Sequence, residues 1–147
     1  MIKLRNFTHD DCEFIVRNFY PNMTHDDGNK MIYEWNTLNY KGSYFEMFAI
    51  IAENKIVGSV SIYDHGNATI GAGPTILEKH RKHGYAYQAL DLVLQDAYQK
   101  GYTKTAAQIR KDNIASIKLH EKSRFILVGD CITSRSNSAF LFEKSLS

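Results

Sequence analysis

The sequence is poor in the residues that mark several protein classes. Its 147 residues include two cysteines, Cys12 and Cys131, which stand far apart in the chain. Two isolated cysteines give neither a disulfide framework nor a metal-binding spacing, so both are expected to be buried, and no metal site is predicted. No apolar run approaches the length of a membrane span, and the first residues lack the apolar core of a signal peptide. These absences predict a cytoplasmic protein with no membrane partner.

Neither sign of charge is in large excess. The formal net charge is +2, and the basic residues form no long run, which excludes the footprint of a nucleic-acid-binding protein. The charge is nevertheless uneven, because residues 1–60 carry 6 Lys and Arg against 8 Asp and Glu, whereas residues 61–147 carry 12 against 8. The second part is therefore suited to an anionic ligand and the first part to a cationic one.

The chain length and the spacing of apolar residues predict one domain over residues 1–147, of mixed α/β (α+β) class. Period-two and helical spacing give the order β-α-α-β-β-β-α-β-α-β-β. Strands are expected at 2–7, 47–52, 55–62, 68–76, 103–110, 125–132 and 139–143. Helices are expected from residue 8 or 10 to Pro21, from about 29 to Gly42, from 84 to Gly101 and from 113 to 122. Residues 22–28 are expected to form a polar loop.

The fourth expected strand contains Gly71, Gly73 and Pro74. A glycine inside a strand marks a bulge or the close approach of another group, and proline cannot continue a hydrogen-bonded ladder. The pattern therefore predicts that this strand is interrupted and opens just before the loop that follows it.

That loop combines basic residues with a helix start. Arg81, Lys82 and His83 stand directly before Gly84, where the helical pattern begins. The first N–H groups of a helix lack intrahelical partners and lie at the positive end of the helix dipole. Gly84 and Ala86 are small enough for a ligand to approach the backbone. The segment therefore predicts phosphate binding, although neither well-known glycine-rich phosphate loop is present.

Aromatic residues are dense between residues 19 and 45. Two helices packing on a sheet would account for most of them. The alternative is that they form one wall of a pocket, where Tyr33, Glu34 and Trp35 would hold a small ammonium group by charge and by ring faces.

Two motifs in this order resemble those of the GNAT superfamily of acyl-CoA-dependent N-acetyltransferases. The family pattern Gln/Arg-x-x-Gly-x-Gly/Ala is matched by Arg81-Lys-His-Gly84-Tyr-Ala86, and the pattern Asn-x-x-Ala/Ser-x-x-Leu-Tyr-x-x-x-Gly-Phe is approached by Asn113-Ile-Ala-Ser116-Ile-Lys-Leu119-His120-Glu-Lys-Ser-Arg124-Phe125. The resemblance implies a mixed, mostly antiparallel sheet of about seven strands flanked by four helices, with two central strands splayed around CoA.

The resemblance also implies acetyl-CoA as the co-substrate. Its pantetheine would lie between the splayed strands, against the backbone near Pro74, Thr75 and Ile76. The diphosphate would rest on the amides of Lys82, His83, Gly84, Tyr85, Ala86 and Tyr87, with Arg81 beside them. Asn113 would assist cofactor binding while capping its helix, and Ser116 would be a residue of that helix's first turn.

The sequence departs from the family pattern at two positions. His120 replaces the tyrosine that protonates the departing thiolate; an imidazole has an unperturbed pKa of about 6.5, against about 10 for tyrosine. We expect His120 to orient or protonate the sulfur, the alternative being a surface histidine at a helix end. Arg124 replaces a glycine, which predicts that the turn there is built without a left-handed residue.

No general base stands in its usual family places, where this chain has Ile70 and Gln108. The remaining candidates are His25, Asp26, Glu34, Asp64, His65 or a water chain. Removing a proton near pH 7 costs roughly 4–5 kcal/mol for a lysine-like amine and about 1 kcal/mol for an α-amine. The prediction is therefore that the acceptor is a small primary amine or a free α-amine. Direct attack on acetyl-CoA is predicted because neither Cys12 nor Cys131 lies near the cofactor motifs.

Three other functions remain open at this stage. The chain could be a non-catalytic acyl-CoA-binding or regulatory module, or a protein N-terminal or lysine acetyltransferase. An unrelated nucleotide-phosphate binder is disfavoured, because the Lys-Ser/Thr and Mg²⁺-ligating positions of such proteins are missing. A homodimer is possible, since edge strands of the resembling family often pair.

Overall fold

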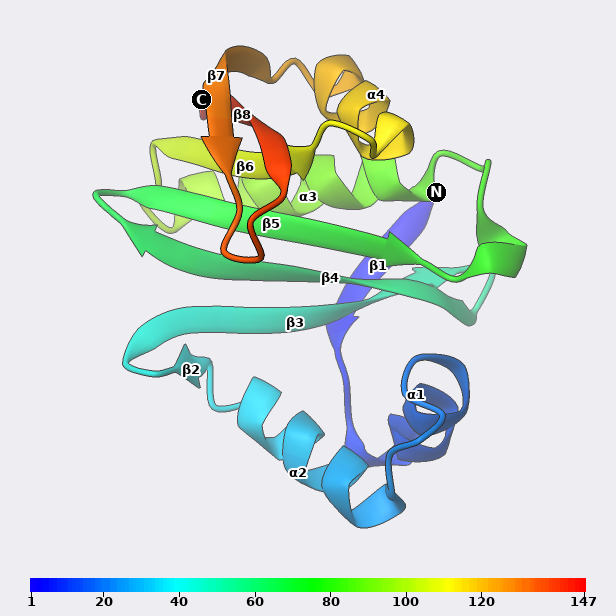
Figure 1. Cartoon of the computed structure of the whole chain (residues 1–147). Coiled ribbons are helices and arrows are strands. Elements are labelled where there is room, and N and C mark those ends of the chain that lie inside the picture. The colour runs from blue at the N-terminus through cyan, green and yellow to red at the C-terminus, as the bar shows by residue number, and fades with distance from the viewer.

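The computed structural model describes all 147 residues and confirms the mixed α/β class (Figure 1). The strands are β1 Ile2–Asn6, β2 Asn39–Tyr40, β3 Ser43–Ala52, β4 Lys55–Gly66, β5 Thr69–Ile76, β6 Lys104–Arg110, β7 Ile126–Ile132 and β8 Ser138–Ser145. The helices are α1 Cys12–Asn18, α2 His25–Trp35, α3 Tyr85–Gln99 and α4 Ile114–Lys122, with 3-10 turns at His9–Asp11 and Glu78–His80. No helix is both long and apolar enough to cross a membrane.

One mixed sheet organises the molecule, in the order β1-β3-β4-β5-β6-β8-β7, with β2 paired to β3. All neighbours are antiparallel except β5 and β6, which are parallel. That parallel pair joins only Thr69 to Lys104 and Ile70 to Thr105. Beyond these two contacts β5 and β6 separate, as the predicted splay requires.

Alternation along β3 builds a core on each face of the sheet. Ile50 and Ala52 belong to the larger core, together with the inner residues of α3. Ala49 belongs to a smaller core with Ile15 of α1 and Ile32 of α2. Successive strand residues point to opposite faces, so α3 covers one face and the α1–α2 pair covers part of the other. Figure 1 shows α1 and α2 together beside β3, at the opposite end of the molecule from α4 and β7.

The predicted bounds of the second helix are wrong. The structure begins α2 at His25 and ends it at Trp35. The Thr24 hydroxyl accepts a hydrogen bond from the Asp27 N–H at 3.1 Å, which is an N-cap, and acidic residues in a first turn are favoured by the helix dipole. The polar run that we interpreted as a loop is therefore the capped first turn.

The predicted interruption of β5 is also wrong. Every residue of β5 pairs with β4, and the register shift in this hairpin lies at Asp64 and Gly66 rather than at the glycines of β5. Gly71 instead lets two side chains of β4 approach the backbone of β5. An added Cβ would lie 2.6 Å from the Tyr63 ring and 2.6 Å from the His65 imidazole. The opening at β5 comes from the missing neighbour on its β6 side.

The turn after α4 corrects a further prediction. Arg124 adopts φ 69°, the left-handed conformation that we expected the arginine to avoid. The Phe125 N–H donates to the His120 carbonyl at 2.9 Å, and the Arg124 N–H donates to the Glu121 carbonyl at 3.0 Å. This pair of bonds is a Schellman motif, which stabilises the helix end despite a non-glycine residue at its left-handed position.

β7 is an edge strand with large apolar side chains in solvent. Ile126, Leu127, Val128 and Ile132 are each at least half exposed. Pairing with a second copy would cover such an edge. The homodimer stays a prediction.

Candidate functional site

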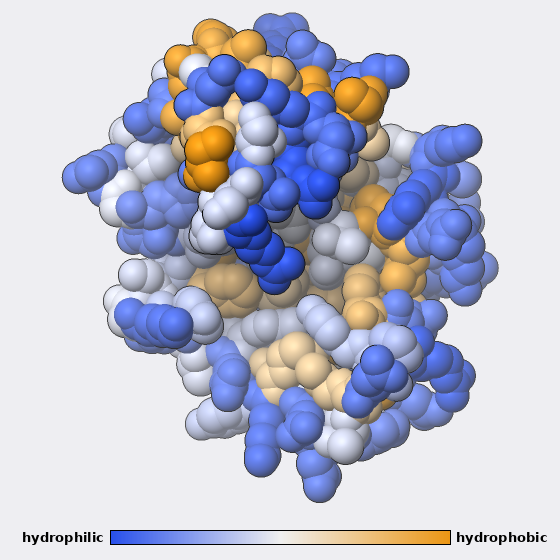
Figure 2. All heavy atoms as spheres, viewed as in Figure 1, coloured by the Kyte–Doolittle hydropathy of each residue, from blue (hydrophilic) through white to orange (hydrophobic).

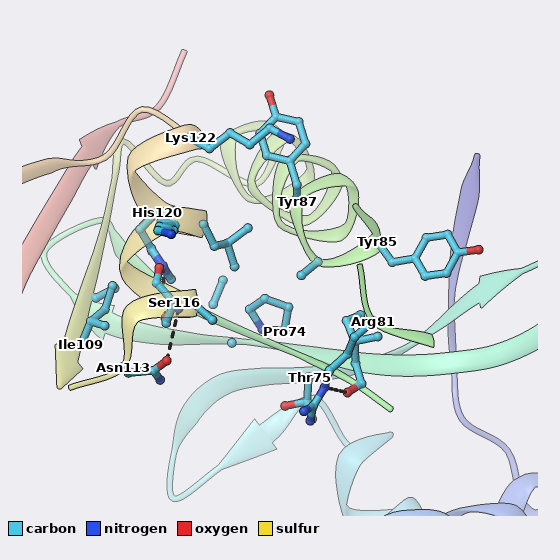
Figure 3. Close-up of a pocket in the computed structure, with 18 of the residues that line it drawn as sticks. Pro74, Thr75, Arg81, Tyr85, Tyr87, Ile109, Asn113, Ser116, His120 and Lys122 are labelled. Atoms are coloured by element: carbon cyan, nitrogen blue, oxygen red, sulfur yellow. Dashed lines mark hydrogen bonds between the residues drawn. The ribbon is translucent and has the colours of Figure 1, made fainter. Parts of the chain in front are cut away.

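A slot of about 910 Å³ lies where β5 and β6 separate. It is bounded by the two strands, by the loop and first turn of α3, and by one face of α4 (Figure 3). The lining residues on the strands are consecutive, 72–76 on β5 and 106–109 on β6. Because neighbouring strand residues point to opposite faces, the slot passes through the sheet and opens on both sides of it.

The face turned away from α3 is hollowed in its centre (Figure 2). The floor of this recess is pale to orange, whereas most of its rim is blue, so weakly polar and apolar residues lie deep and hydrophilic residues surround them. An apolar floor inside a polar rim is typical of a small-molecule site.

The N-terminus of α3 faces the slot without a side-chain cap. Gly84 is the N-cap in a left-handed conformation, φ 77°, and no side chain bonds to the first turn. The first helical bond runs from the Gln88 N–H to the Gly84 carbonyl at 3.1 Å. The N–H groups of Tyr85, Ala86 and Tyr87 precede it and are therefore available to an anion at the positive end of the helix dipole.

Basic side chains gather around this helix end from two segments. His80, Arg81 and Lys82 line the slot from the loop, and Lys118 and Lys122 line it from α4. Figure 3 shows Lys122 reaching across to Tyr87 of α3, where its Nζ lies 4.5 Å from the ring centroid. Sequence reasoning missed His80, Lys118 and Lys122. The two α4 lysines have a detectable signal, since residues four apart share one helix face.

Two loop residues have other contacts than predicted. The Arg81 Nε donates to the Ile76 carbonyl at 3.1 Å, so this side chain also ties the loop to the end of β5 (Figure 3). His83 lies outside the slot lining. Its Nδ1 is 3.0 Å from the Arg81 carbonyl oxygen, and its ring stacks on Tyr85 at 5.4 Å between centroids. His83 thus orders the loop in this structure.

The start of α4 forms the wall opposite β5. Asn113 Oδ1 accepts a hydrogen bond from the Ser116 N–H at 3.2 Å, the expected N-cap. Both residues line the slot, as do Pro74, Thr75 and Ile76 on the facing strand. The structure therefore brings the predicted cofactor-binding residues of β5, the loop and α4 together around one space, with His83 the exception.

His120 is buried, with 5% of its surface exposed, and it lines the slot from α4. Its Nδ1 is 2.8 Å from the Ser116 carbonyl oxygen, and its ring meets Phe125 edge-on at 4.7 Å. Phe125 is held there by the Schellman motif. The alternative of a surface histidine is therefore wrong.

The protonation state of His120 follows from these contacts. Burial lowers the pKa of its imidazole, and the hydrogen bond to the Ser116 carbonyl only partly offsets this. A neutral ring that donates Nδ1–H to Ser116 leaves Nε2 as an acceptor. Neutral His120 can therefore orient a donor or take up a proton at Nε2, whereas acting as an acid requires charging a buried ring.

The three predicted acceptor-binding residues of α2 lie outside the slot lining. Trp35 packs on Phe7 with 5.4 Å between ring centroids and belongs to the smaller core. Tyr33 is 66% exposed, and Glu34 is also exposed. Packing on the sheet thus accounts for Trp35, and a role of Tyr33 and Glu34 towards an acceptor stays a prediction.

The predicted candidates for the general base lie in two places, on α2 and at the end of β4. His25, Asp26 and Glu34 lie on α2, outside the slot. Asp64 accepts a hydrogen bond from the Gly66 N–H at 2.6 Å. The next residue, His65, points to the other face of the sheet, where its ring lies 4.7 Å from that of Tyr63.

Tyr63 lines the slot on the open face and was missed in the sequence. Burial raises the pKa of its phenol, so the hydroxyl stays protonated at neutral pH. Its partner across the strands is Gly71. A tyrosine opposite a glycine in a hairpin was the signal that could have revealed this contact.

The structure is thus an α/β protein whose mixed sheet is split between β5 and β6, with an uncapped helix N-terminus beside the split. The family comparison agrees: the model of the acetyltransferase (GNAT) domain matches residues 2–126. The chain belongs to this family, and the resemblance is confirmed.

A curated relative is the SPbeta prophage-derived uncharacterized N-acetyltransferase YokL of Bacillus subtilis (strain 168). It is 29% identical over 99 residues, which cover 65% of this chain. The aligned region spans 56% of the relative, so the chain matches little more than half of that protein.

Solved structures share the fold across the chain. A ribosomal L7/L12 alpha-N-protein acetyltransferase in complex with coenzyme A has a TM-score of 0.86 at 16% identity, covering 99% of this chain and 94% of that one. Spermidine N-acetyltransferase from Vibrio cholerae, in complex with CoA and spermine, has a TM-score of 0.80 at 15% identity, covering 99% and 95%. An N-acetyltransferase from Staphylococcus aureus Mu50 has a TM-score of 0.76 at 20% identity, covering 100% and 99%.

Proposed function

We propose that the protein transfers an acetyl group from acetyl-CoA to a primary amine. Acetyl-CoA would supply the activated acetyl group as a thioester. The chain would bind the diphosphate with the N–H groups of Tyr85, Ala86 and Tyr87, and the pantetheine along the unpaired edge of β5. Asn113 and Ser116 would close the opposite wall.

The observation that carries this proposal is the slot itself. It begins at an uncapped helix N-terminus, which suits a diphosphate, and continues between β5 and β6, whose facing edges have no ladder partner beyond two residue pairs. A chain with amide groups, such as pantetheine, can pair with a strand edge in the manner of an added strand. The basic side chains from the loop and from α4 supply the positive charge that a nucleotide phosphate requires.

We infer that the acceptor approaches from the face away from α3 and α4, because those helices carry the phosphate-binding groups. The acceptor would be a small primary amine or a free α-amine. No carboxylate lines the slot, and an α-amine needs the smaller free energy, about 1 kcal/mol, to lose its proton near pH 7. The named activities of two structural neighbours, on a protein α-amine and on spermidine, are compatible with either kind of acceptor.

The alternative is a non-catalytic acyl-CoA-binding module. One observation favours this alternative. Burial lowers the pKa of His120, so its ring is mostly uncharged at neutral pH and does not replace the tyrosine that donates a proton in the resembling family. Cofactor binding without turnover is what this alternative predicts.

Calorimetric titration with acetyl-CoA, followed by measurement of CoA release over an amine panel, tests the proposal. We expect binding, and turnover with at least one amine. In a thermal-shift competition acetyl-CoA should stabilise the protein and ATP should not. Stabilisation by ATP with no response to acetyl-CoA would overturn the proposal, and binding without turnover of any amine would support the module instead. The Lys122→Ala variant should bind acetyl-CoA a few-fold more weakly, and Lys30→Ala, on α2, should bind it like the parent.

A further inference from the structure

A tyrosine and a histidine stand together over a glycine on the open face of the sheet. Tyr63 and His65 are two apart on β4, and both side chains approach Gly71, so they share one face despite the register shift between Asp64 and Gly66. Their rings are 4.7 Å apart. Gly71 lies beneath them on β5, and a Cβ there would come within 2.6 Å of His65 Nε2 and within 2.6 Å of Tyr63 Cζ. The pair can occupy this place only because residue 71 has no side chain.

Tyr63 lines the slot at its closed end, and His65 lies next to Tyr63, exposed and outside the slot lining. β5 and β6 are joined at Thr69 and Ile70, and the slot lining begins at Ala72, where the two strands part. The α3 helix end is at the other end, just beyond Ile76. Four residues of strand separate Ala72 from Ile76, about 13 Å. A ligand with its phosphates on α3 and its tail along β5 therefore brings the tail's reactive end towards Tyr63.

The aromatic surface continues away from the slot. Phe45 of β3 is the cross-strand partner of Tyr63, and residues directly opposite each other share a face with Cβ atoms about 5 Å apart. The Tyr40 ring lies 6.2 Å from that of Phe45. Aromatic side chains on this face thus extend from β2 across β3 to the closed end of the slot, where the His65 imidazole lies beside Tyr63.

We propose that Tyr63, His65 and Phe45 form the acceptor subsite, that it takes a primary amine carried by an aromatic group, and that His65 is the general base. This inference rests on the proposed acetyl transfer and identifies its acceptor class. Ring-to-ring contact with Phe45 and Tyr63 holds the aromatic group, and the amine then lies beside His65 Nε2.

Protons and electrons balance in this step. The amine nitrogen forms a bond to the acetyl carbonyl carbon, and the carbon–sulfur bond breaks with its electron pair going to sulfur. The proton lost by the nitrogen goes to His65 Nε2, and the sulfur is protonated from solvent or from the charged imidazole. The products are the N-acetyl amine and the free thiol, and no oxidant or metal is required.

The test compares four variants and two amines. His65→Gln keeps the size of the side chain but removes the base, Phe45→Ala removes one ring, and Gly71→Ala displaces both Tyr63 and His65. His9→Gln is the matched control, since His9 is exposed on the 3-10 turn before α1 and bonds only Asn29, at 3.1 Å. The amines are 2-phenylethylamine and butylamine, and the acetyl-CoA dissociation constant of each variant is measured by calorimetry.

We expect His65→Gln to lower kcat by about 100-fold or more, with the acetyl-CoA affinity unchanged, because a general base acts only in the chemical step. Phe45→Ala should raise the KM for 2-phenylethylamine and leave that for butylamine unchanged. The parent should prefer 2-phenylethylamine by about tenfold or more in kcat/KM, which corresponds to one buried aromatic contact. Gly71→Ala should lose turnover but keep acetyl-CoA binding.

A second readout does not depend on turnover. In the parent saturated with CoA, 2-phenylethylamine should shift the imidazole NMR resonances of His65 and leave those of His9 unchanged. An unchanged kcat in His65→Gln, or equal use of the two amines, would overturn the inference while acetyl-CoA binding and turnover still support the proposed function. Failure of the parent to bind acetyl-CoA would instead overturn the proposed function, and this inference with it.

Discussion

Two regions of this molecule are rich in aromatic and charged residues, and only one of them is hollow. Around α1 and α2 the rings pack on one another, as Phe7 does on Trp35 at 5.4 Å and Phe14 on Phe19 at 6.4 Å. Around the split between β5 and β6 the side chains surround about 910 Å³ of space. The composition of a segment therefore does not distinguish a pocket wall from a packed layer.

The difference has a backbone cause. In the α1–α2 region β1, β3 and β4 pair with one another along their length, so the helices pack on a closed part of the sheet. At the slot, β5 and β6 are joined by only two residue pairs and then diverge, so neither strand nor side chain fills the gap. If this comparison is correct, changes at the slot should affect ligand binding and turnover, whereas changes around α1 and α2 should affect stability.

The largest effect is expected at Gly84. Gly84→Val places a branched side chain at φ 77° beside the proposed diphosphate site, and a residue with a branched Cβ is strained at this φ. Acetyl-CoA affinity should fall by more than about tenfold, equivalent to at least 1.4 kcal/mol. Gly42→Val is the matched control, because Gly42 has φ 88° and open space around it in the β2–β3 turn. Equal affinities of the two variants by calorimetry would contradict the site.

His120 should matter to the rate of turnover. His120→Ala is expected to lower kcat by roughly 100-fold while the KM for acetyl-CoA changes little, since proton transfer or orientation at sulfur acts in the chemical step. His120→Tyr should keep appreciable activity if position is what matters. Because the ring is buried, circular dichroism must first establish that each variant is folded. An unchanged kcat in a folded His120→Ala protein would assign the histidine to packing alone.

In the other region, Asp11 should affect stability and leave turnover unchanged. Its carboxylate receives two hydrogen bonds from Arg5, at 2.8 and 3.0 Å, and one from the Thr8 N–H at 2.8 Å. Asp11→Asn should lower the free energy of unfolding by about 1–2 kcal/mol at pH 7, the lower part of the usual range, because Arg5 is partly exposed. Acetyl-CoA affinity and kcat should equal those of the parent.

The pH dependence of that loss has a definite sign. Burial raises the pKa of the Asp11 carboxyl, but the bonds from Arg5 and Thr8 outweigh it and hold the pKa below its usual 3.8. The stabilisation is therefore present above pH 3.8 and disappears as the pH falls through the lower, folded-state pKa. Urea unfolding at pH 7 and at pH 3 should show the difference between variant and parent shrinking. A difference that stays constant would mean that the ion pair is not its source.

Arg124→Gly should stabilise the protein by about 1 kcal/mol. The arginine is left-handed at φ 69°, where glycine is free of the Cβ penalty, although glycine also makes the unfolded chain more flexible. Thermal unfolding measures the gain. His120 should stay in place, because the motif that holds Phe125 on it uses backbone groups, so kcat should not change. Destabilisation would indicate that Arg124 makes a stabilising contact that outweighs its strain.

The smallest effects are expected at the exposed residues of α2. Tyr33→Ala and Glu34→Gln should each change the acceptor KM by less than about twofold and the stability by less than about 0.5 kcal/mol, as is usual for surface positions. Steady-state kinetics with the best amine of the panel measures this. A large rise in KM for either variant would restore the predicted acceptor wall on α2 and show that this region also binds a ligand.

Several features set by neighbours in the chain were predicted correctly, although the first turn of α2 and the turn at Arg124 were not. Gly101 ends α3 with φ 99°, Asn113 caps α4, and Glu53 and Asn54 turn the β3–β4 hairpin, both with positive φ. These outcomes depend on local sterics and on hydrogen bonds across a few residues, which a short stretch of sequence contains. The start of α3 after Gly84 belongs to the same class, and phosphate binding by its free N–H groups stays a prediction.

Other features required the complete fold. The burial of His120 depends on Phe125 and Phe142, and the lysines of α4 reach the slot only because α4 packs beside α3. Gly71 is needed because β4 places Tyr63 and His65 above it, and that placement depends on strand register. A shift of one residue would turn these side chains to the other face. Local sequence was therefore enough to locate most helices and turns. Which side chains meet across strands could be seen only in the folded molecule, because those contacts depend on register and packing between segments distant in the chain.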